Sequence, residues 1–475
     1  MSQHEEEWAD LIVDPRQYTS AASLPDPGSI KVYDTTLRDG EQMPGVAMSP
    51  EQKYAISKEL SALGCHIVDL GFPASSPGER EALQLVLGGK LKGEIREDLE
   101  ILVMCRATQQ DIDTTIRAIE STGFSANEIT FLIFTSASNL HCKYKLGPML
   151  LRREGRDARE LLDTPLEFFH EANKRMIFDA ISYARGKGIA RIEFGAEDAS
   201  RTPPAQLIDL AQAAIGAGAT RYNFPDTTGS LTPEATRFYC ATLAEALPDI
   251  ERVSHFHNDF DLATVNVITG VLNGFPVFTT TINGLGERAG NAPLHSVVAA
   301  LKYLYDLEIP GFEYDRLWHA KQVVEEITGI PVQAQEPVIG HNVFSHESGI
   351  HTHGVSISRR MYEPIPYEEV GGKARFVYGK HSGSNALFDL LTGRASEIGQ
   401  EIDKDFLMKV LAEIKRVRES LTYTSDAAKF VQNYYEQLER FGLSEDEVIQ
   451  LAKGLAAGAG ERGRPTRAAD AGGGD

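Results

Sequence analysis

The stretch "IKVYDTTLRDG" (Ile30–Gly40) opens the pattern that decides the fold. Its apolar first half predicts a buried strand, and its second half predicts a polar loop at the end of that strand. The segment "SPEQKYAISKELSALG" (Ser49–Gly64) then predicts a helix. Its first residue is a suitable N-cap, Pro50 fits the first helical position, Gln52 completes a capping box, and its last residue is a glycine that can end the helix.

This strand-then-helix unit repeats along the chain. Short apolar strands that alternate with longer amphipathic helices imply parallel strands joined by crossovers. Eight such units between residues 30 and 310 predict an α/β fold, a (β/α)₈ TIM barrel, with an open doubly wound sheet as the alternative. The seven further predicted strands are "HIVDLGFP" (66–73), "LEILVMCRA" (99–107), "EITFLIFTS" (128–136), "ARIEFGAED" (190–198), "TRYNFPDTT" (220–228), "RVSHFHND" (252–259) and "VFTTTING" (277–284).

Two regions are extra to a minimal barrel. Residues 136–163 are too long and too charged for an ordinary connection, and they predict a lid or an extra helix. Beyond about residue 310 the pattern stops, and the His-rich segment that follows looks irregular. The predicted division of the chain is an N-terminal extension (1–28), a catalytic barrel (29–310), a linker subdomain (311–386), a small helical C-terminal region (387–456) and a disordered tail (457–475).

The composition excludes several classes of function. A net charge of −21 argues against nucleic acid and anionic membranes as partners, because a phosphate backbone is bound through an excess of Lys and Arg. The four cysteines form no C-x-x-C pair, so neither a disulfide framework nor a zinc knuckle is expected. The N-terminus lacks the apolar core of a secretory signal, and no apolar run approaches the ~18 residues of a spanning helix. We therefore expect a cytoplasmic protein.

The stretch "VSHFHNDFD" (Val253–Asp261) holds two histidines on one predicted strand. Positions i and i+2 share a face of a strand, so His255 and His257 can present both imidazoles to one point in the barrel mouth. Alone, this pattern also fits ordinary polar residues at a strand end. Asp39 and Asn291 follow the first and eighth strands, which are neighbours in a closed barrel. Such a mixed N and O ligand set suits Mg²⁺, Mn²⁺, Co²⁺ or Zn²⁺.

Six motifs together resemble one enzyme family. In this order they are found in the 2-isopropylmalate, homocitrate, citramalate and Re-type citrate synthases of the DRE-TIM metallolyase superfamily. The resemblance runs from about residue 30 to residue 385. The motifs are "DTTLRDGEQMPG" (34–45), "GFPASSPGE" (71–79), "FGAEDASR" (194–201), "PDTTG" (225–229), "HFHND" (255–259) and "TINGLGERAGN" (281–291).

The resemblance implies a Claisen-type condensation of acetyl-CoA with a 2-oxo acid, followed by thioester hydrolysis to a 2-substituted malate and CoA. By motif, Asp39, His255, His257 and Asn291 resemble the metal ligands, and Arg38 resembles the residue beside the reacting ketone. The chemistry is consistent, since a divalent cation polarises the keto group and a guanidinium stabilises the alkoxide that develops.

The resemblance also implies a base and a carboxylate-binding residue. Glu197 resembles a family residue near the acetyl methyl group, and His351 resembles the histidine that reaches the site from the linker of the neighbouring subunit. Thr227 resembles a residue that contacts the carboxylate of the 2-oxo acid. Because the histidine comes from the neighbouring subunit in this family, the resemblance also implies a homodimer. The structural alternatives are that Glu197 only orients its neighbours, that Thr227 caps a helix, and that His351 is a packed linker residue.

Departures from the family pattern bear on the substrate. Many members carry a His on the fourth strand where counting gives Thr130, and Asp261 replaces a common Gly. Both departures favour a specialised member, such as a 2-phosphinomethylmalate or 2-phosphonomethylmalate synthase, over a housekeeping 2-isopropylmalate or homocitrate synthase. Residues 283–291 lack the reactive Cys of the lyase branch, which favours a synthase over the alternative metal-dependent aldolase or lyase. A catalytically silent barrel is the other alternative.

Overall fold

Eight parallel strands close into a barrel in the order of the chain. Each strand pairs with the next, and β8 returns to β1 with Lys31 opposite Val277 and Asp34 opposite Thr280. The predicted (β/α)₈ barrel is therefore confirmed, and the open doubly wound sheet is wrong. The strands are β1 (Lys31–Asp34), β2 (Ile67–Asp69), β3 (Glu100–Arg106), β4 (Thr130–Ser136), β5 (Arg191–Glu197), β6 (Arg221–Asp226), β7 (Glu251–Phe256) and β8 (Val277–Thr280).

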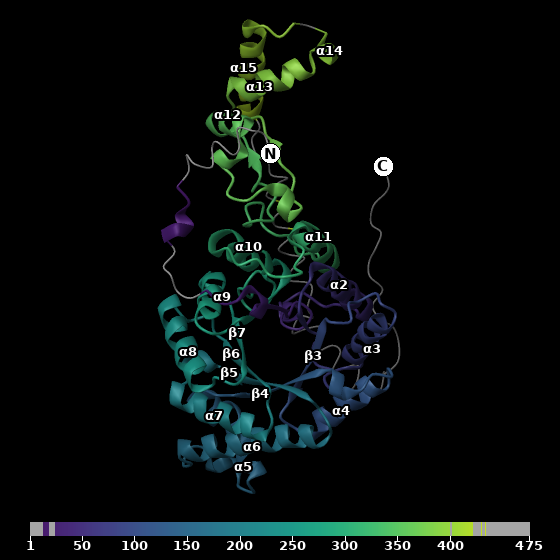
Figure 1. The fold of residues 1–475 in the computed structure, drawn as a ribbon, viewed down its shortest axis with the longest axis vertical. Coiled ribbons are helices and arrows are strands. Elements are labelled where there is room, and N and C mark those ends of the chain that lie inside the picture. The colour runs from purple at the N-terminus through teal and green to yellow at the C-terminus, as the bar shows by residue number, and fades with distance from the viewer. Residues whose placement is uncertain (1–12, 19–23, 400, 421–428, 430–432, 434–475) are drawn as a thin grey trace. The chain divides into compact units, whose positions relative to one another are not determined.

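Helices surround these strands (Figure 1). The computed structural model describes residues 13–18, 24–399, 401–420, 429 and 433. The elements named here belong to one compact unit that comprises Met1–Met43 and Ala47–Ser420. The helices that follow the eight strands are α2 (Pro50–Leu63), α3 (Pro77–Leu91), α4 (Gln109–Glu120), α6 (Leu166–Gly186), α7 (Pro204–Ala217), α8 (Pro233–Ala246), α9 (Ala263–Leu272) and α10 (Leu294–Tyr305).

Helix α2 begins and ends as the sequence predicts. The Ser49 hydroxyl accepts from the Gln52 backbone N–H, and the Gln52 side chain accepts from the Ser49 N–H at 2.7 Å. Gly64 ends the helix in the left-handed region, at φ 87°. A Cβ on Gly64 would also lie 2.0 Å from the carbonyl oxygen of Gly311. Two independent constraints therefore require glycine here.

The barrel interior is apolar in the middle and charged at its N-terminal end, which we call the floor. Tyr33, Leu102 and Val253 belong to a cluster of buried side chains from six strands. Below it Arg221 of β6, only 5% exposed, binds the carboxylates of Glu193 on β5, Glu251 on β7 and Glu100 on β3; its Nε lies 2.5 Å from Glu251 Oε2. The N-terminal end of the barrel is closed by this charged layer.

The position of Thr130 corrects one inference from the sequence. Thr130 is the first residue of β4, and its hydroxyl donates to Glu100 Oε1 at 2.6 Å in the charged floor. It therefore lies at the end of the barrel opposite to the strand ends that carry the site, and it cannot shape a substrate pocket there. The β4 side chains that line the mouth are those of Leu132 and Phe134.

The long segment after β4 contains extra helix, as predicted. A π-helical turn (His141–Lys145) leads into α5 (Gly147–Arg153), and a 3₁₀ turn (Ala158–Leu161) follows. The apolar side chains of Leu150 and Leu151 are fully buried and anchor the segment. We call residues 137–165 the β4 insertion.

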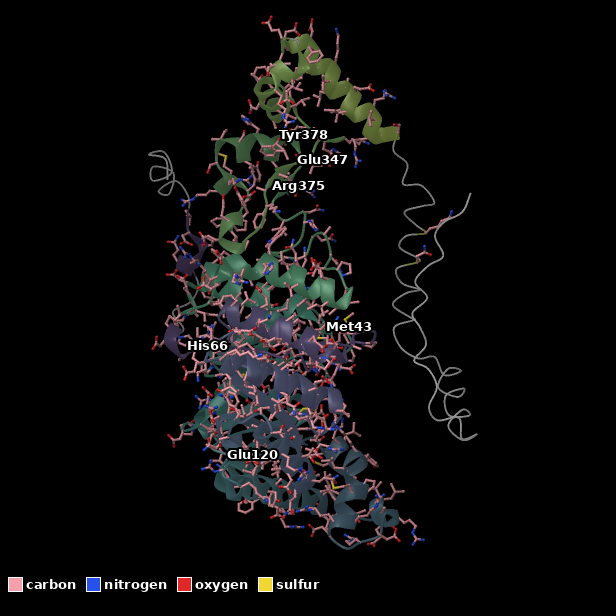
Figure 2. All side chains as sticks on the ribbon, turned by 90° about the vertical axis from the view of Figure 1, so that its right-hand side faces the viewer. Met43, His66, Glu120, Glu347, Arg375 and Tyr378 are labelled. Carbon is pink, nitrogen blue, oxygen red and sulfur yellow. The ribbon has the colours of Figure 1, made fainter. Side chains whose placement is uncertain are left out.

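The region after α10 is more regular than the sequence suggests. Its helices are α11 (Leu317–Thr328), α12 (Gly349–Ile357), α13 (Ser384–Gly393), α14 (Ala395–Ile398) and α15 (Lys404–Ser420), and a short sheet joins β9 (Ser345–His346) to β10 (Arg375–Phe376). The expectation that 311–386 is irregular is wrong for α11, where Leu317, Ala320 and Val324 form a buried stripe at helical spacing. Arg375, labelled in Figure 2, donates from Nε to Ser345 Oγ at 2.8 Å.

Helix α15 packs part of its apolar side against α13. Leu407 and Leu411 pack against Leu387 of α13. The predicted helix beyond residue 420, the predicted disordered tail (457–475) and most of the N-terminal extension lie outside the described residues. Within the described part of the chain, no helix is both long enough and apolar enough to span a membrane.

Substitution of Gly64 tests the close approach between α2 and the segment at Gly311. Gly64→Ala should lower the melting temperature, because the left-handed backbone and the clash together cost about 1–3 kcal/mol or more. Gly123→Ala is the matched control, since Gly123 has φ 89° but no heavy atom within 4 Å of its missing Cβ. Equal losses in thermal unfolding of the two variants would contradict the proposed clash.

Candidate functional site

The carboxyl ends of the strands surround a cavity of about 300 Å³ at the barrel mouth. Chemistry in (β/α)₈ barrels is placed at this end. Of the eight residues that the sequence singles out, six line the cavity: Arg38, Asp39, Glu197, Thr227, His255 and His257. Asn291 lies beside it, in contact with Asp39, whereas His351 is not among the lining residues.

Three of these side chains converge on one point. Asp39 Oδ2 lies 3.2 Å from His255 Nε2 and 3.9 Å from His257 Nε2, and the two Nε2 atoms are 3.3 Å apart. All three residues are buried, and together they form a group that could hold a metal ion. The shared face that the H-x-H spacing predicts for the two histidines is therefore present in the structure.

Contacts with neighbouring residues set the direction in which the His255 ring points. His255 Nδ1 is hydrogen-bonded to Thr279 Oγ1 on β8 at 2.8 Å, so its Nε2 faces Asp39 and His257. Burial, and then the charge of His255, lowers the pKa of His257 to about 4. The His257 ring is therefore neutral near pH 7, and a neutral imidazole is the form that binds a metal.

Asn291 reaches this group through the loop after β8. His257 and Asn291 form an isolated antiparallel bridge, and Asn258 N–H donates to the Gly290 carbonyl at 2.8 Å. Asn291 Nδ2 donates to Asp39 Oδ2 at 2.8 Å, and its buried Oδ1 has no hydrogen-bond partner in the described residues. Gly290 has φ 91°, and a Cβ on it would lie 2.0 Å from the Gly284 carbonyl oxygen, so only glycine fits this turn.

Arg38 is held by two buried carboxylates. Its Nε donates to Asp69 Oδ2 at 2.7 Å, and its Nη1 lies 3.4 Å from Asp39 Oδ2. Burial would raise the pKa of Asp39, but Arg38 and the two histidines outweigh burial and lower the pKa far below its usual range. Asp69, on β2, was not predicted from the sequence. Its signal was an acid inside the apolar strand "HIVDLGFP".

Glu197 is part of an ion pair that sequence reasoning missed. Lys145 Nζ lies 2.6 Å from both carboxylate oxygens of Glu197, and the Ser136 hydroxyl donates to one of them. Lys145 belongs to the β4 insertion. The insertion was recognisable in the sequence, but the residue that it would deliver to the site was not.

Thr227 lies at the mouth without capping a helix. Its hydroxyl accepts from the Asp198 backbone N–H at 2.9 Å, and its carbonyl accepts from Arg288 at 2.7 Å. Helix α8 is capped by Thr232 instead, so the helix-cap interpretation of Thr227 is wrong. Because its oxygen is used as an acceptor, the Thr227 hydroxyl proton can point into the cavity toward a carboxylate.

His351 contacts other residues of the linker region. It lies on α12, and its ring stacks on Tyr362 with the centroids 4.1 Å apart. The ring of His346 is 5.9 Å away. His351 itself is exposed, and the structure does not bring it together with the other predicted site residues.

Asp261 has a conformational role. It is exposed and has φ 59°, the left-handed backbone that glycine adopts without strain and that Asp tolerates better than most residues. Its side chain accepts from Asn258 Nδ2 at 3.3 Å, and it is not among the residues that line the cavity. Asp261 therefore makes no contact in the cavity that would support a specialised substrate, and that interpretation stays a prediction.

Two sequence models of known protein families match the chain. A sequence model described as HMGL-like matches residues 29–324, and one described as "Homocitrate synthase post-HMGL domain-like" matches residues 338–421. The first match covers the whole barrel, and the second lies in the region after α11.

Curated relatives share more than a third of their residues with the chain. A probable 2-isopropylmalate synthase from Ignicoccus hospitalis is 37% identical, over 87% of this chain and 94% of its own length. A 2-isopropylmalate synthase from Sulfurisphaera tokodaii is 39% identical, over 82% and 91%. The homocitrate synthase AksA from Methanocaldococcus jannaschii is 37% identical, over 84% and 88%. The chain therefore belongs to the HMGL-like family, within the branch of DRE-TIM condensing enzymes.

Proposed function

We propose that this protein condenses acetyl-CoA with a 2-oxo acid and hydrolyses the thioester, giving a 2-substituted malate and free CoA. The observation that carries the proposal is the convergence of Asp39, His255 and His257 beside Arg38 in one cavity. The names of the relatives support it, since they are 2-isopropylmalate, homocitrate and, for one, putative (R)-citramalate synthases. The protein would accordingly be an acyltransferase.

The donor set at the mouth fits a divalent cation. Two imidazole nitrogens, one carboxylate oxygen and an unpartnered amide oxygen on Asn291 make a mixed N and O site. Asp39, His255, His257 and Asn291 would hold Mn²⁺, Mg²⁺, Co²⁺ or Zn²⁺. When bound, the cation would supply Lewis acidity to the keto group of the substrate.

Arg38 stabilises the charge that develops on the keto oxygen. As the acetyl carbon attacks C2, the C=O electrons move onto oxygen, and a fixed guanidinium beside that oxygen lowers the barrier. The hydrogen bond from Nε to Asp69 holds the guanidinium in place before the substrate arrives. Thr227, which follows β6, donates to the carboxylate of the 2-oxo acid.

A proton must leave the acetyl methyl group before the carbon–carbon bond forms. Glu197 is the carboxylate at the mouth that can accept it, with Lys145 and Ser136 fixing its position. We also propose a homodimer in which His351 of one subunit enters the site of the other and donates a proton to the new alkoxide. After condensation, water cleaves the thioester and CoA leaves as its thiol.

The identity of the 2-oxo acid is a separate question. A phosphinomethylmalate or phosphonomethylmalate synthase remains a prediction, and a housekeeping 2-isopropylmalate or homocitrate synthase is the alternative that the relatives favour. A lyase on the same barrel is the alternative from another reaction class. It would cleave a carbon–carbon bond and would release no CoA from a mixture of acetyl-CoA and a 2-oxo acid.

Thiol release tests the reaction. The protein with acetyl-CoA, Mn²⁺ and at least one 2-oxo acid should release CoA, detected as free thiol, together with a product of the mass of the substituted malate. The panel should include pyruvate, 2-oxoisovalerate, 2-oxoglutarate, oxaloacetate, phosphonopyruvate, phenylpyruvate and 2-oxooctanoate. Omission of the 2-oxo acid is the control. If no pairing releases thiol, the synthase assignment fails.

Thermal unfolding with metal alone tests the ligands. Mn²⁺ or Co²⁺ at about 100 times its Kd should stabilise the protein by about 2.7 kcal/mol, because it binds only the folded state. Asp39→Ala and His255→Ala should abolish this rise in melting temperature. His381→Ala is the control, since His381 is exposed and lies in the linker region. A metal-dependent rise that persists in both site variants would contradict the assignment.

A further inference from the structure

A second cavity adjoins the barrel mouth. It measures about 640 Å³ and shares Phe134 and Glu197 with the 300 Å³ cavity of the candidate site. Its walls are the end of β3, the start of α4, helix α6 and the β4 insertion. No step of the proposed reaction uses it, although its volume is typical of a small-molecule site.

The wall of this second cavity is mostly apolar, although uncharged polar side chains such as Gln109 and Thr135 also line it. Phe134 forms the side nearest the mouth, Leu146 and Met149 come from the β4 insertion, and Met176 and Ala180 come from α6. Met176 and Ala180 are otherwise buried, at 5% and 4% exposure, and they face empty space only in this cavity. An apolar group placed here would bury its surface at about 25 cal/mol per Å².

The charged residues around the cavity neutralise one another. Arg106 makes two hydrogen bonds to Asp111, at 2.7 and 3.0 Å. Arg153 lies 2.5 Å from Asp179, and Lys145 lies 2.6 Å from Glu197. Among the described lining residues, each cation therefore already has a carboxylate partner. A second carboxylate or a phosphonate on a substrate would find no free cation there and would have to displace one of these pairs.

The direction of the substrate follows from the closed barrel. Its carboxylate and keto oxygen would be held at β1 and β7, near Arg38 and the Asp39–His255 pair. In an eight-stranded ring with neighbours β8 and β1, the wall opposite is β3 to β5. Atoms beyond C2 therefore extend across the mouth toward Phe134.

The mouth is wider on that side because one wall residue is a glycine. Gly195 lies on β5 in the wall of the mouth. A Cβ on Gly195 would lie 3.1 Å from Leu132 Cδ1 and 3.2 Å from Phe134 Cβ, closer than side chains normally pack. Glycine at this position leaves the space above Leu132 and beside Phe134 open to a substrate.

We propose that the second cavity receives the side chain of the 2-oxo acid, and that the substrate carries a bulky, uncharged apolar side chain such as an aryl or a long alkyl group. The proposal rests on the proposed condensation reaction. It separates this protein from an enzyme that acts on pyruvate, on 2-oxoglutarate or on a phosphonopyruvate, because none of these fills an apolar cavity of about 640 Å³.

A substrate series tests the proposal in the metal-loaded enzyme. Thiol release with phenylpyruvate and 2-oxooctanoate is compared with pyruvate, 2-oxoglutarate and phosphonopyruvate, and kcat/KM should be at least ~10-fold higher for the two bulky acids. Calorimetry gives an independent readout, since phenylpyruvate should bind with a lower Kd than pyruvate. A preference for pyruvate or for a dianionic acid would overturn the proposal, while thiol release itself would still support the condensation reaction.

Substitutions that place larger side chains in the second cavity provide a second test of the proposal. Ala180→Phe and Met176→Trp should lower kcat/KM for phenylpyruvate at least ~10-fold more than for pyruvate, with KM for acetyl-CoA unchanged. Phe178→Leu is the control, since Phe178 lies on the same helix, is 44% exposed and does not line the cavity. If both variants instead raise KM for acetyl-CoA with every 2-oxo acid, the cavity holds the arm of CoA and the proposal is wrong. Turnover of pyruvate reports that a variant is folded.

Discussion

The pairing of β8 with β1 is the interaction on which the site depends. It joins the two ends of a sheet whose strands are otherwise consecutive, and it places Asp39 beside the two histidines at the end of β7. Without closure, Asp39 would be separated from His255 by five intervening strands. Each side chain of the triad is set by a strand end, so the convergence of the triad is a property of the barrel and not of any one loop.

Loops complete what the strands begin. The turn at Gly290 allows Asn291 to bridge back to His257, and Arg288 ties this loop to Asp259 and to the Thr227 carbonyl. These contacts hold the ends of β6, β7 and β8 together. The donors at the mouth are thus fixed before any ligand binds, which reduces the ordering entropy that a ligand would otherwise have to overcome.

The sequence predicted the parts that depend on periodicity and missed those that depend on register. The strands, the caps of α2 and the shared face of His255 and His257 follow from local spacing, and all are present. The position of Thr130 at the start of β4 was not foreseen, because counting along a motif does not reveal which end of a strand a residue occupies. The pairing of Lys145 with Glu197 joins residues 52 positions apart through a non-repeating insertion, so no pattern could indicate it.

The charged floor of the barrel has a kinetic consequence. Arg221 and its three carboxylates occupy the N-terminal end of the barrel, and the candidate site lies at the opposite end, at the mouth. In a pocket closed at one end, the ligand that sits deepest must arrive first and depart last. The 2-oxo acid, which would be held near Arg38, would therefore bind before the thioester. On release, free CoA would leave before the malate. The order of binding and release would then follow from the shape of the pocket, even if the two substrates had equal affinity.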